Sequence, residues 1–166
     1  MKSILLILLL TTFGCGKSNN NAPGSAIRID PVFTDPTRSP EGAVSDLAWL
    51  INDHRARLGL PTTMTVFALA QEADYHATNM SDGRVPLGHF GLAERCMNSR
   101  RALGGGNACS EVVAAGQMNS EATMRSWMNS WGHRRIIEDP RFTRMGVGVA
   151  VSRTGRPYWT VIFLQY

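Results

Sequence analysis

The sequence predicts an α+β fold in which helices come first and a pair of strands closes the domain. Apolar residues recur at helical spacing from about residue 43 onward, and two runs rich in Val and aromatic residues end the chain. This order is typical of an α+β domain rather than of a parallel, doubly wound sheet. The chain has 166 residues, of which 43% are hydrophobic and 18% charged, so one folded domain with a tail is expected.

The first residues, 1–14, are expected to form a signal peptide. It opens with a short basic region that contains Lys2. The uninterrupted apolar run 4–10 that follows is too short to span a bilayer as a helix. Gly14 directly before Cys15 resembles a bacterial lipoprotein cleavage site, where Cys15 becomes the lipid-modified N-terminus. The alternative is an ordinary cleaved signal with an incidental cysteine. We therefore expect an exported protein of the cell envelope, facing the periplasm or the exterior and anchored to the membrane through a lipid on Cys15.

A flexible, lipid-anchored linker is predicted over 15–42. This segment is rich in Asn, Ser, Pro and Gly, and it shows neither helical nor strand periodicity. The folded domain is then expected to occupy 43–166.

Three helices are expected where apolar residues repeat every three or four positions. The first is expected to have its N-cap at Ser45 and to end at Gly59 and Pro61. The second ends near 81–83, and the third begins after 119–120. Their inner faces are formed by Val44, Leu47, Ile51, His54 and Leu58, by Val66, Leu69, Ala73, Ala77 and Met80, and by Met124, Trp127 and Trp131.

The closing strands are expected over 146–152, which is rich in Val, and over 158–164, which is aromatic and β-branched. The turn-forming sequence Thr-Gly-Arg-Pro at 154–157 separates them. A turn of this length between two such runs predicts an antiparallel hairpin.

The three cysteines favour one disulfide. If Cys15 carries a lipid, Cys96 and Cys109 remain as a pair, and export to an oxidising compartment favours a bond between them. Closing the loop between them would stabilise the fold by roughly 3 kcal/mol in the chain-entropy model. The alternative is two free buried thiols, and a zinc site on these cysteines is disfavoured because no CxxC or HxxxH pattern flanks them.

Two histidines and one glutamate are the candidate site residues. His89 and His133 each follow a glycine in a predicted loop or helix end, and Glu111 lies between them in the sequence. Two imidazoles and a carboxylate can hold zinc with an open position for water, or can perform general acid–base catalysis. The alternative is a buried polar network that clamps loops to helices. His54 and His76 are expected to be packed or surface helix residues rather than ligands.

Phosphate and nucleic-acid binding are not indicated. The formal net charge is +4, but the arginines are scattered and form no basic stripe with interleaved aromatic residues. The glycines at 104–106 are not followed by the Lys-Ser/Thr of a phosphate loop, and Gly146-Val147-Gly148 opens a strand rather than a helix. We therefore expect no nucleic-acid partner.

Six segments resemble motifs of one family, in order along the chain. They are Asn52-x-x-Arg55-x-x-x-Gly59-Leu60-Pro61; Leu69-Ala70 through Ala77 and Met80; Gly88-His89; Ser110-Glu111-Val112-Val113-Ala114-Ala115-Gly116; Trp127-Met128-Asn129-Ser130 with Gly132-His133-Arg134 and Ile136-Ile137; and Phe142-Thr143 with Gly146-Val147-Gly148, Tyr158-Trp159-Thr160 and Phe163. On these residues the chain resembles the CAP superfamily of cysteine-rich secretory, antigen 5 and pathogenesis-related proteins, in its bacterial SCP-like extracellular branch. The resemblance covers about 43–166.

This resemblance implies an α-β-α sandwich with a central antiparallel sheet and a solvent-open cleft lined by a His, Glu, Glu, His tetrad. By position, His89, Glu111 and His133 match three members of the tetrad. Ser130 stands where the second glutamate is expected, and Val112 replaces the usual Asn. The expected site therefore has three members, with Ser130 as a hydrogen-bonding neighbour.

The resemblance also implies what the domain does. Members of this superfamily are associated with divalent-metal binding at the two histidines, with sterol or lipid binding, and in a few cases with protease activity. We expect a membrane-anchored binding module that holds Zn²⁺ or another divalent metal between His89 and His133 and takes a protein, peptide or lipid ligand in the cleft. The alternatives are a metal-dependent hydrolase with Glu111 as general base, and a structural or interaction domain with a vestigial site.

Overall fold

The structure is a computed structural model that describes residues 40–166, with side chains from Gly42 onward. The predicted signal peptide, Cys15 and most of the predicted linker lie outside the described residues. The elements are α1 (Pro40–Arg57), β1 (Met64–Thr65), α2 (Phe67–Ser81), α3 (Leu92–Leu103), β2 (Cys109–Ala115), α4 (Ser120–Met128), α5 (Trp131–Ile137), β3 (Arg144–Val151) and β4 (Pro157–Leu164). None of these helices is long and apolar enough to cross a membrane.

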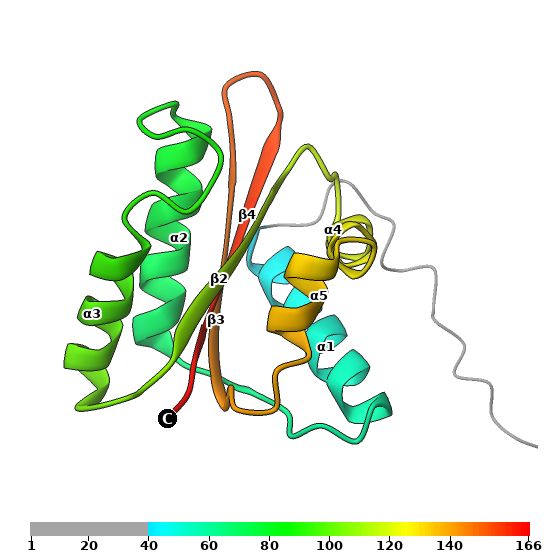
Figure 1. The fold of residues 1–166 in the computed structure, drawn as a ribbon. Coiled ribbons are helices and arrows are strands. Elements are labelled where there is room, and N and C mark those ends of the chain that lie inside the picture. Colours follow the sequence, from blue (N-terminus) through cyan, green and yellow to red (C-terminus); the bar gives the residue numbers. More distant parts are fainter. Residues whose placement is uncertain (1–39) are drawn as a thin grey trace, which may run out of the picture. The chain divides into compact units, whose positions relative to one another are not determined.

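The elements form three layers, with the sheet in the middle (Figure 1). Helices α2 and α3 cover one face of the sheet, and α1, α4 and α5 cover the other. The strand order is β1-β3-β4-β2, with β4 antiparallel to both β3 and β2. The predicted α+β class and α-β-α sandwich are confirmed. The sheet is mixed rather than wholly antiparallel, because the two-residue β1 pairs in parallel with the start of β3.

The predicted elements agree with the structure to different degrees. The second helix and the closing hairpin are confirmed, as α2 and as β3 and β4. The predicted N-cap at Ser45 is wrong, because α1 already begins at Pro40. Four elements, β1, α3, β2 and α5, were not predicted. In α3 the buried residues are Arg95, Cys96 and Ser99, so its inner face carries no apolar periodicity.

Most of the apolar core lies between the sheet and the layer of α1, α4 and α5. Trp127 of α4 and Trp159 of β4 are among its largest buried side chains, with 1% and 2% of their surface exposed. The Trp127 indole N–H donates to the carbonyl of Val113, 3.1 Å away, which ties α4 to β2. Trp131 was predicted on the inner side, and this is wrong: it is 67% exposed, with the guanidinium of Arg135 over its ring.

Helix α2 packs directly on two glycines of β3. A Cβ atom at Gly146 would lie 2.1 Å from the backbone nitrogen of Ala70, and one at Gly148 would lie 2.3 Å from that of Asp74. Real Cβ atoms essentially never approach backbone this closely. The Gly-Val-Gly sequence, which lies in a strand as predicted, therefore serves helix–sheet packing.

The buried Arg55 connects the end of α1 to the chain around α5. Its side chain is fully buried and donates to four backbone carbonyls, those of Pro61, Ile137, Asp139 and Phe142, at 2.6 to 3.0 Å. These bonds hold both the end of α5 and the start of the segment leading to β3. They thereby fix the helix that carries His133.

Candidate functional site

Glu111 is the centre of the candidate site. It lies in β2, is 2% exposed, and points into the layer of α2 and α3. From the first turn of α3, Arg95 donates from Nε to Oε2 at 2.9 Å and from Nη2 to Oε1 at 2.9 Å. Arg95 is itself only 6% exposed, and its Nη1 donates to the carbonyl of Phe90 at 2.7 Å. The carboxylate charge is therefore balanced by a buried, two-point ion pair.

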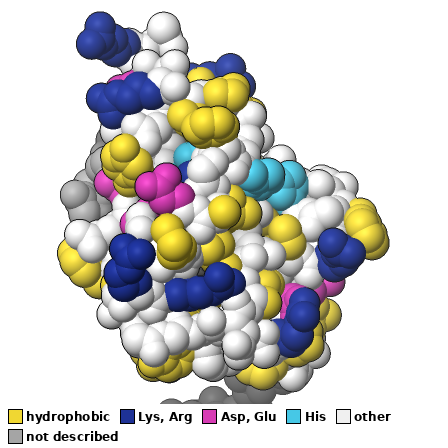
Figure 2. Space-filling model, turned by 60° about the vertical axis from the view of Figure 1, so that its left-hand side comes forward, with side chains coloured by type: hydrophobic (Ala, Val, Ile, Leu, Met, Phe, Trp, Pro, Cys, Tyr) yellow, Lys and Arg dark blue, Asp and Glu magenta, His cyan; other side chains and the backbone are white. Residues whose placement is uncertain are grey.

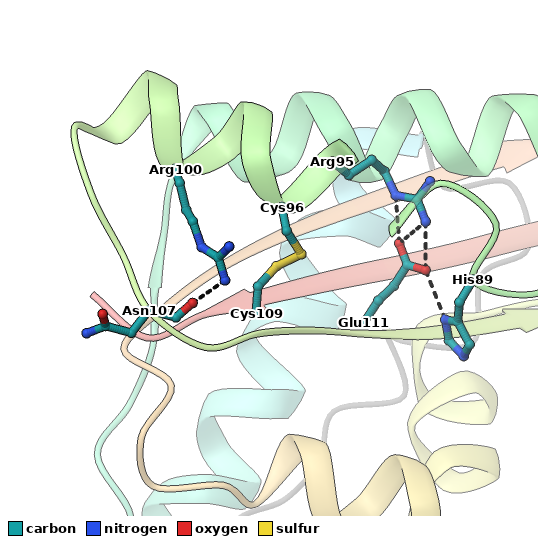
Figure 3. The surroundings of a disulfide bond; sticks show 7 residues. All are labelled: His89, Arg95, Cys96, Arg100, Asn107, Cys109 and Glu111. Carbon is teal, nitrogen blue, oxygen red and sulfur yellow. Dashed lines mark hydrogen bonds and ion pairs between the residues drawn. A yellow bond between two sulfur atoms is a disulfide. The ribbon is translucent and has the colours of Figure 1, made fainter. Parts of the chain in front are cut away.

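His89 reaches the same carboxylate from the loop between α2 and α3 (Figure 3). Its Nδ1 lies 2.9 Å from Oε1 of Glu111, and 48% of its side chain is exposed. An ionised carboxylate only accepts hydrogen bonds, so Nδ1 carries the proton. When the ring is neutral, Nε2 is therefore the unprotonated nitrogen on this half-exposed side chain.

His76 forms a second, buried contact with this site. Its Nε2 donates to the carbonyl of Gly88 at 2.7 Å and lies 3.7 Å from Oε1 of Glu111. Burial is the main cause that lowers the pKa of His76, against the opposing effects of the Gly88 bond and the Glu111 charge. The neutral ring thus fastens the loop carrying His89 to α2. His76 is packed in a helix, as predicted, but its place beside Glu111 was not predicted.

The predicted disulfide between Cys96 and Cys109 is confirmed, and it lies next to the ion pair (Figure 3). Cys96 follows Arg95 directly on α3, and Cys109 precedes Glu111 by two residues on β2. The covalent bond and the ion pair therefore join the same helix to the same strand.

His133 approaches the site from the opposite layer. It lies in α5, with its ring centroid 6.4 Å from that of Trp127, and its Nδ1 is buried without a hydrogen-bond partner among the described residues. Burial lowers the pKa of His133, and a positive charge on His89, when that ring is protonated, lowers it further. His89 and His133 are thus close enough to interact electrostatically. The neutral state of His133 keeps one ring nitrogen unprotonated.

Ser130 lies at the N-terminal boundary of α5, three residues before His133. Its side chain makes no capping hydrogen bond. In the part of the chain that the structure describes, no hydrogen bond from its hydroxyl to His89, Glu111 or His133 is present. The expectation that Ser130 is a hydrogen-bonding neighbour of the site is therefore not met by a direct bond.

These contacts limit what the site can do chemically. Within residues 40–166, no group of three or more His, Cys, Asp or Glu side chains is arranged to hold a metal ion. Both oxygens of Glu111 are occupied by Arg95, and one also by His89. The protein ligands on offer are thus two imidazoles, with Glu111 orienting one of them from behind, as carboxylates do for metal-binding histidines.

Two residues of this site, Arg95 and His76, were missed by sequence reasoning. Arg95 could have been found only by recognising α3, because a lone arginine six residues after His89 carries no local signal. His76 lies on the apolar stripe of α2, where a packed histidine is the ordinary interpretation. Both become site residues because β2 brings Glu111 against them.

One protein family matches most of the chain. The model of the cysteine-rich secretory protein family, CAP, matches residues 49–163. The protein YkwD of Bacillus subtilis (strain 168) is 28% identical over 152 residues, covering 87% of this chain and 55% of YkwD. The chain thus spans about half the length of this curated relative.

Two solved structures share the fold. An extracellular protein containing a SCP domain from Bacillus anthracis str. Ames is 27% identical with a TM-score of 0.65, covering 76% of this chain and 41% of that one. An outer surface protein from Borrelia burgdorferi has a TM-score of 0.67 at 18% identity, covering 77% of this chain and 96% of that one. The second comparison supports the fold alone.

Proposed function

Since the chain belongs to the family of cysteine-rich secretory proteins, the CAP family, we propose that it is an exported binding module that holds Zn²⁺ or another divalent metal between His89 and His133. The open coordination positions of such a metal would be available to a donor group of a protein, peptide or lipid ligand.

The unpartnered nitrogen of His133 is the observation that carries this proposal. A buried polar atom without a hydrogen bond is costly, so a group that binds there gains the interaction that the protein does not supply. In its neutral form His89 offers a second unprotonated nitrogen, Nε2, because Nδ1 then carries the proton that Glu111 accepts. Neutral imidazoles are the ligands that zinc and related ions prefer among nitrogen donors.

The contacts of Glu111 favour binding over hydrolysis. A general base must accept a proton from its substrate, and both oxygens of the Glu111 carboxylate already accept hydrogen bonds from Arg95. Glu111 is also only 2% exposed. Its role in the proposal is therefore to orient His89, while a bound metal would supply Lewis-acid character to whatever ligand it contacts.

Export and membrane anchoring belong to the same proposal. One relative is described as extracellular and a protein of the same fold as an outer surface protein, and both descriptions agree with the signal peptide expected over 1–14. The lipid anchor rests on Cys15 alone. Replacing Cys15 by Ser is expected to release the protein from the membrane fraction, whereas unchanged fractionation would contradict the anchor.

Zinc titration by calorimetry tests the metal site. The full chain should bind one metal per molecule, and the His89→Ala/His133→Ala double variant should not. His54→Ala serves as the control, because His54 is paired with Glu138 at 2.9 Å rather than with Glu111. Absence of binding to the wild-type protein, or binding that persists in the double variant, would overturn the proposal.

A further inference from the structure

A pocket of about 220 Å³ lies between α2, α3 and the loop that joins them, and it shares His76 and Arg95 with the candidate site. Figure 2 turns this face toward the viewer, and acidic side chains lie beside apolar ones on it. The residues of its wall that matter here are Glu72, Tyr75, His76, Phe90, Glu94 and Arg95. We propose that this pocket binds the primary ammonium group of an alkylamine or of a lysine side chain.

The charge of the pocket favours a cation. Glu72 and Glu94 contribute two carboxylates to its wall. Arg95 also lines it, but its Nε and Nη2 are bonded to Glu111, and its Nη1 donates to the carbonyl of Phe90. Because Glu111 balances Arg95, the two lining carboxylates leave the pocket with a net negative charge.

A buried histidine in the wall of the pocket has one acceptor without a donor. His76 is 1% exposed, and its Nε2 is occupied by the carbonyl of Gly88. Its Nδ1 has no hydrogen-bond partner within residues 40–166. Since burial lowers the pKa of His76, this nitrogen is unprotonated and accepts a hydrogen bond. A ligand N–H supplies the donor that the protein does not.

Two aromatic rings complete the wall. Tyr75 and Phe90 are 63% and 69% exposed, so both rings are accessible to a ligand in the pocket. The faces of aromatic rings attract cations, and aromatic residues with carboxylates form the sites in which proteins bind ammonium groups. The exposure of both rings beside a negatively charged pocket therefore agrees with a cationic ligand.

The hydrogen-bonding pattern selects a primary ammonium. A –NH₃⁺ group has three donors and no acceptor, and the pocket offers three acceptor groups: the carboxylates of Glu72 and Glu94 and Nδ1 of His76. A quaternary ammonium has no donor and would leave all three unsatisfied. The volume suits a head group with a short chain, because pockets for drug-sized ligands are about 300–1,000 Å³. This inference does not depend on the proposed metal site.

Titration of the ¹⁵N-labelled full chain, followed by NMR, tests the proposal. n-Butylammonium should cause saturable shifts of the backbone amides of Gly91 and Asn98, which also line the pocket. Butyrate and tetramethylammonium at the same concentration should cause none or far weaker ones. The Glu72→Gln/Glu94→Gln double variant should bind n-butylammonium at least roughly tenfold more weakly. Glu121→Gln on α4, in the opposite layer, is the matched control and should bind like the wild type.

The source of the ammonium is distinguished by a second ligand. Tighter binding of Nα-acetyl-lysine amide than of n-butylammonium assigns the pocket to a lysine of a peptide, and the reverse order assigns it to a free amine. Near-ultraviolet circular dichroism confirms that each variant is folded. Equal shifts with butyrate, or equal affinity in the double variant and the wild type, would overturn the proposal.

Discussion

Arg95 and Glu111 form a buried, two-point ion pair, with Nε and Nη2 of the arginine each 2.9 Å from a different carboxylate oxygen. The pair joins α3 to β2, and the Glu111 carboxylate also contacts Nδ1 of His89. It determines both how strongly this part of the fold is held and which groups are left for a ligand.

Arg95→Ala is expected to destabilise the protein by about 3–5 kcal/mol, because it leaves the buried carboxylate of Glu111 without its countercharge. Urea denaturation measures the change in the free energy of unfolding. Arg125→Ala, which removes an exposed arginine from α4, is the control and should change it by less than about 0.5 kcal/mol. A loss below about 1 kcal/mol for Arg95→Ala would mean that the pair is not formed.

Glu111→Gln is expected to weaken zinc binding by roughly 10–100-fold without abolishing it. The amide still accepts a hydrogen bond from Nδ1 of His89 but no longer carries the charge that raises the basicity of the ring. Calorimetric titration measures the affinity, with Glu121→Gln as the control. Complete loss of binding in a folded Glu111→Gln protein would instead make Glu111 a direct ligand.

Gly148→Ala is expected to unfold the protein or to destabilise it by several kcal/mol. The added Cβ would lie 2.3 Å from the backbone nitrogen of Asp74, so α2 and β3 would have to separate. Gly132→Ala on α5 is the matched control, because no atom lies within 4 Å of its added Cβ. Thermal unfolding compares the two variants. Similar unfolding temperatures would show that α2 does not sit so close to the sheet.

Reduction of the disulfide between Cys96 and Cys109 is expected to lower the free energy of unfolding by roughly 3 kcal/mol. The loop it closes spans 13 residues and contains most of α3. Denaturation with and without reductant measures the effect, and the Cys96→Ser/Cys109→Ser variant should lose its sensitivity to reductant. If mass spectrometry without reduction finds two free thiols, the bond is absent from the mature protein.

Stability is expected to fall when the pH drops below about 6.5, the ordinary pKa of histidine. The pKa of His76 is lower in the folded protein, mainly through burial, so the unfolded chain takes up a proton first. The stability that the neutral His76 contributes is fully present above the pKa of this histidine in the unfolded chain. It is lost as the pH falls from there toward the lower pKa of His76 in the folded protein. His133, whose pKa is also lowered, adds to the same slope.

Measurements of the free energy of unfolding between about pH 8 and pH 5 test this expectation. His76→Gln, which keeps a donor for the carbonyl of Gly88, should show a shallower slope than the wild type. An identical slope in the variant would mean that His76 takes up its proton equally in the folded and unfolded states.

Local patterns explain what sequence reasoning predicted correctly. The apolar spacing of α2 and the Val-rich and aromatic runs of β3 and β4 depend only on neighbouring residues. The disulfide followed from counting, because two cysteines remain when Cys15 is set aside. The errors arose where local rules were weak. Helix α3 buries Arg95, Cys96 and Ser99 instead of an apolar stripe, and Trp131 lies on a short helix whose outward face cannot be told from spacing.

The candidate site divides in the same way. That the chain is an α+β member of this family could be inferred from the sequence alone, because motifs keep their order and residue types along the chain. The same motifs single out His89, Glu111 and His133 as candidate site residues. Only the tertiary structure shows that Arg95 balances Glu111 and that Nδ1 of His133 has no partner within the described residues. Charge pairing and burial depend on which elements pack together, and residues on α3, β2 and α5 meet only after the sheet has formed between its two helical layers.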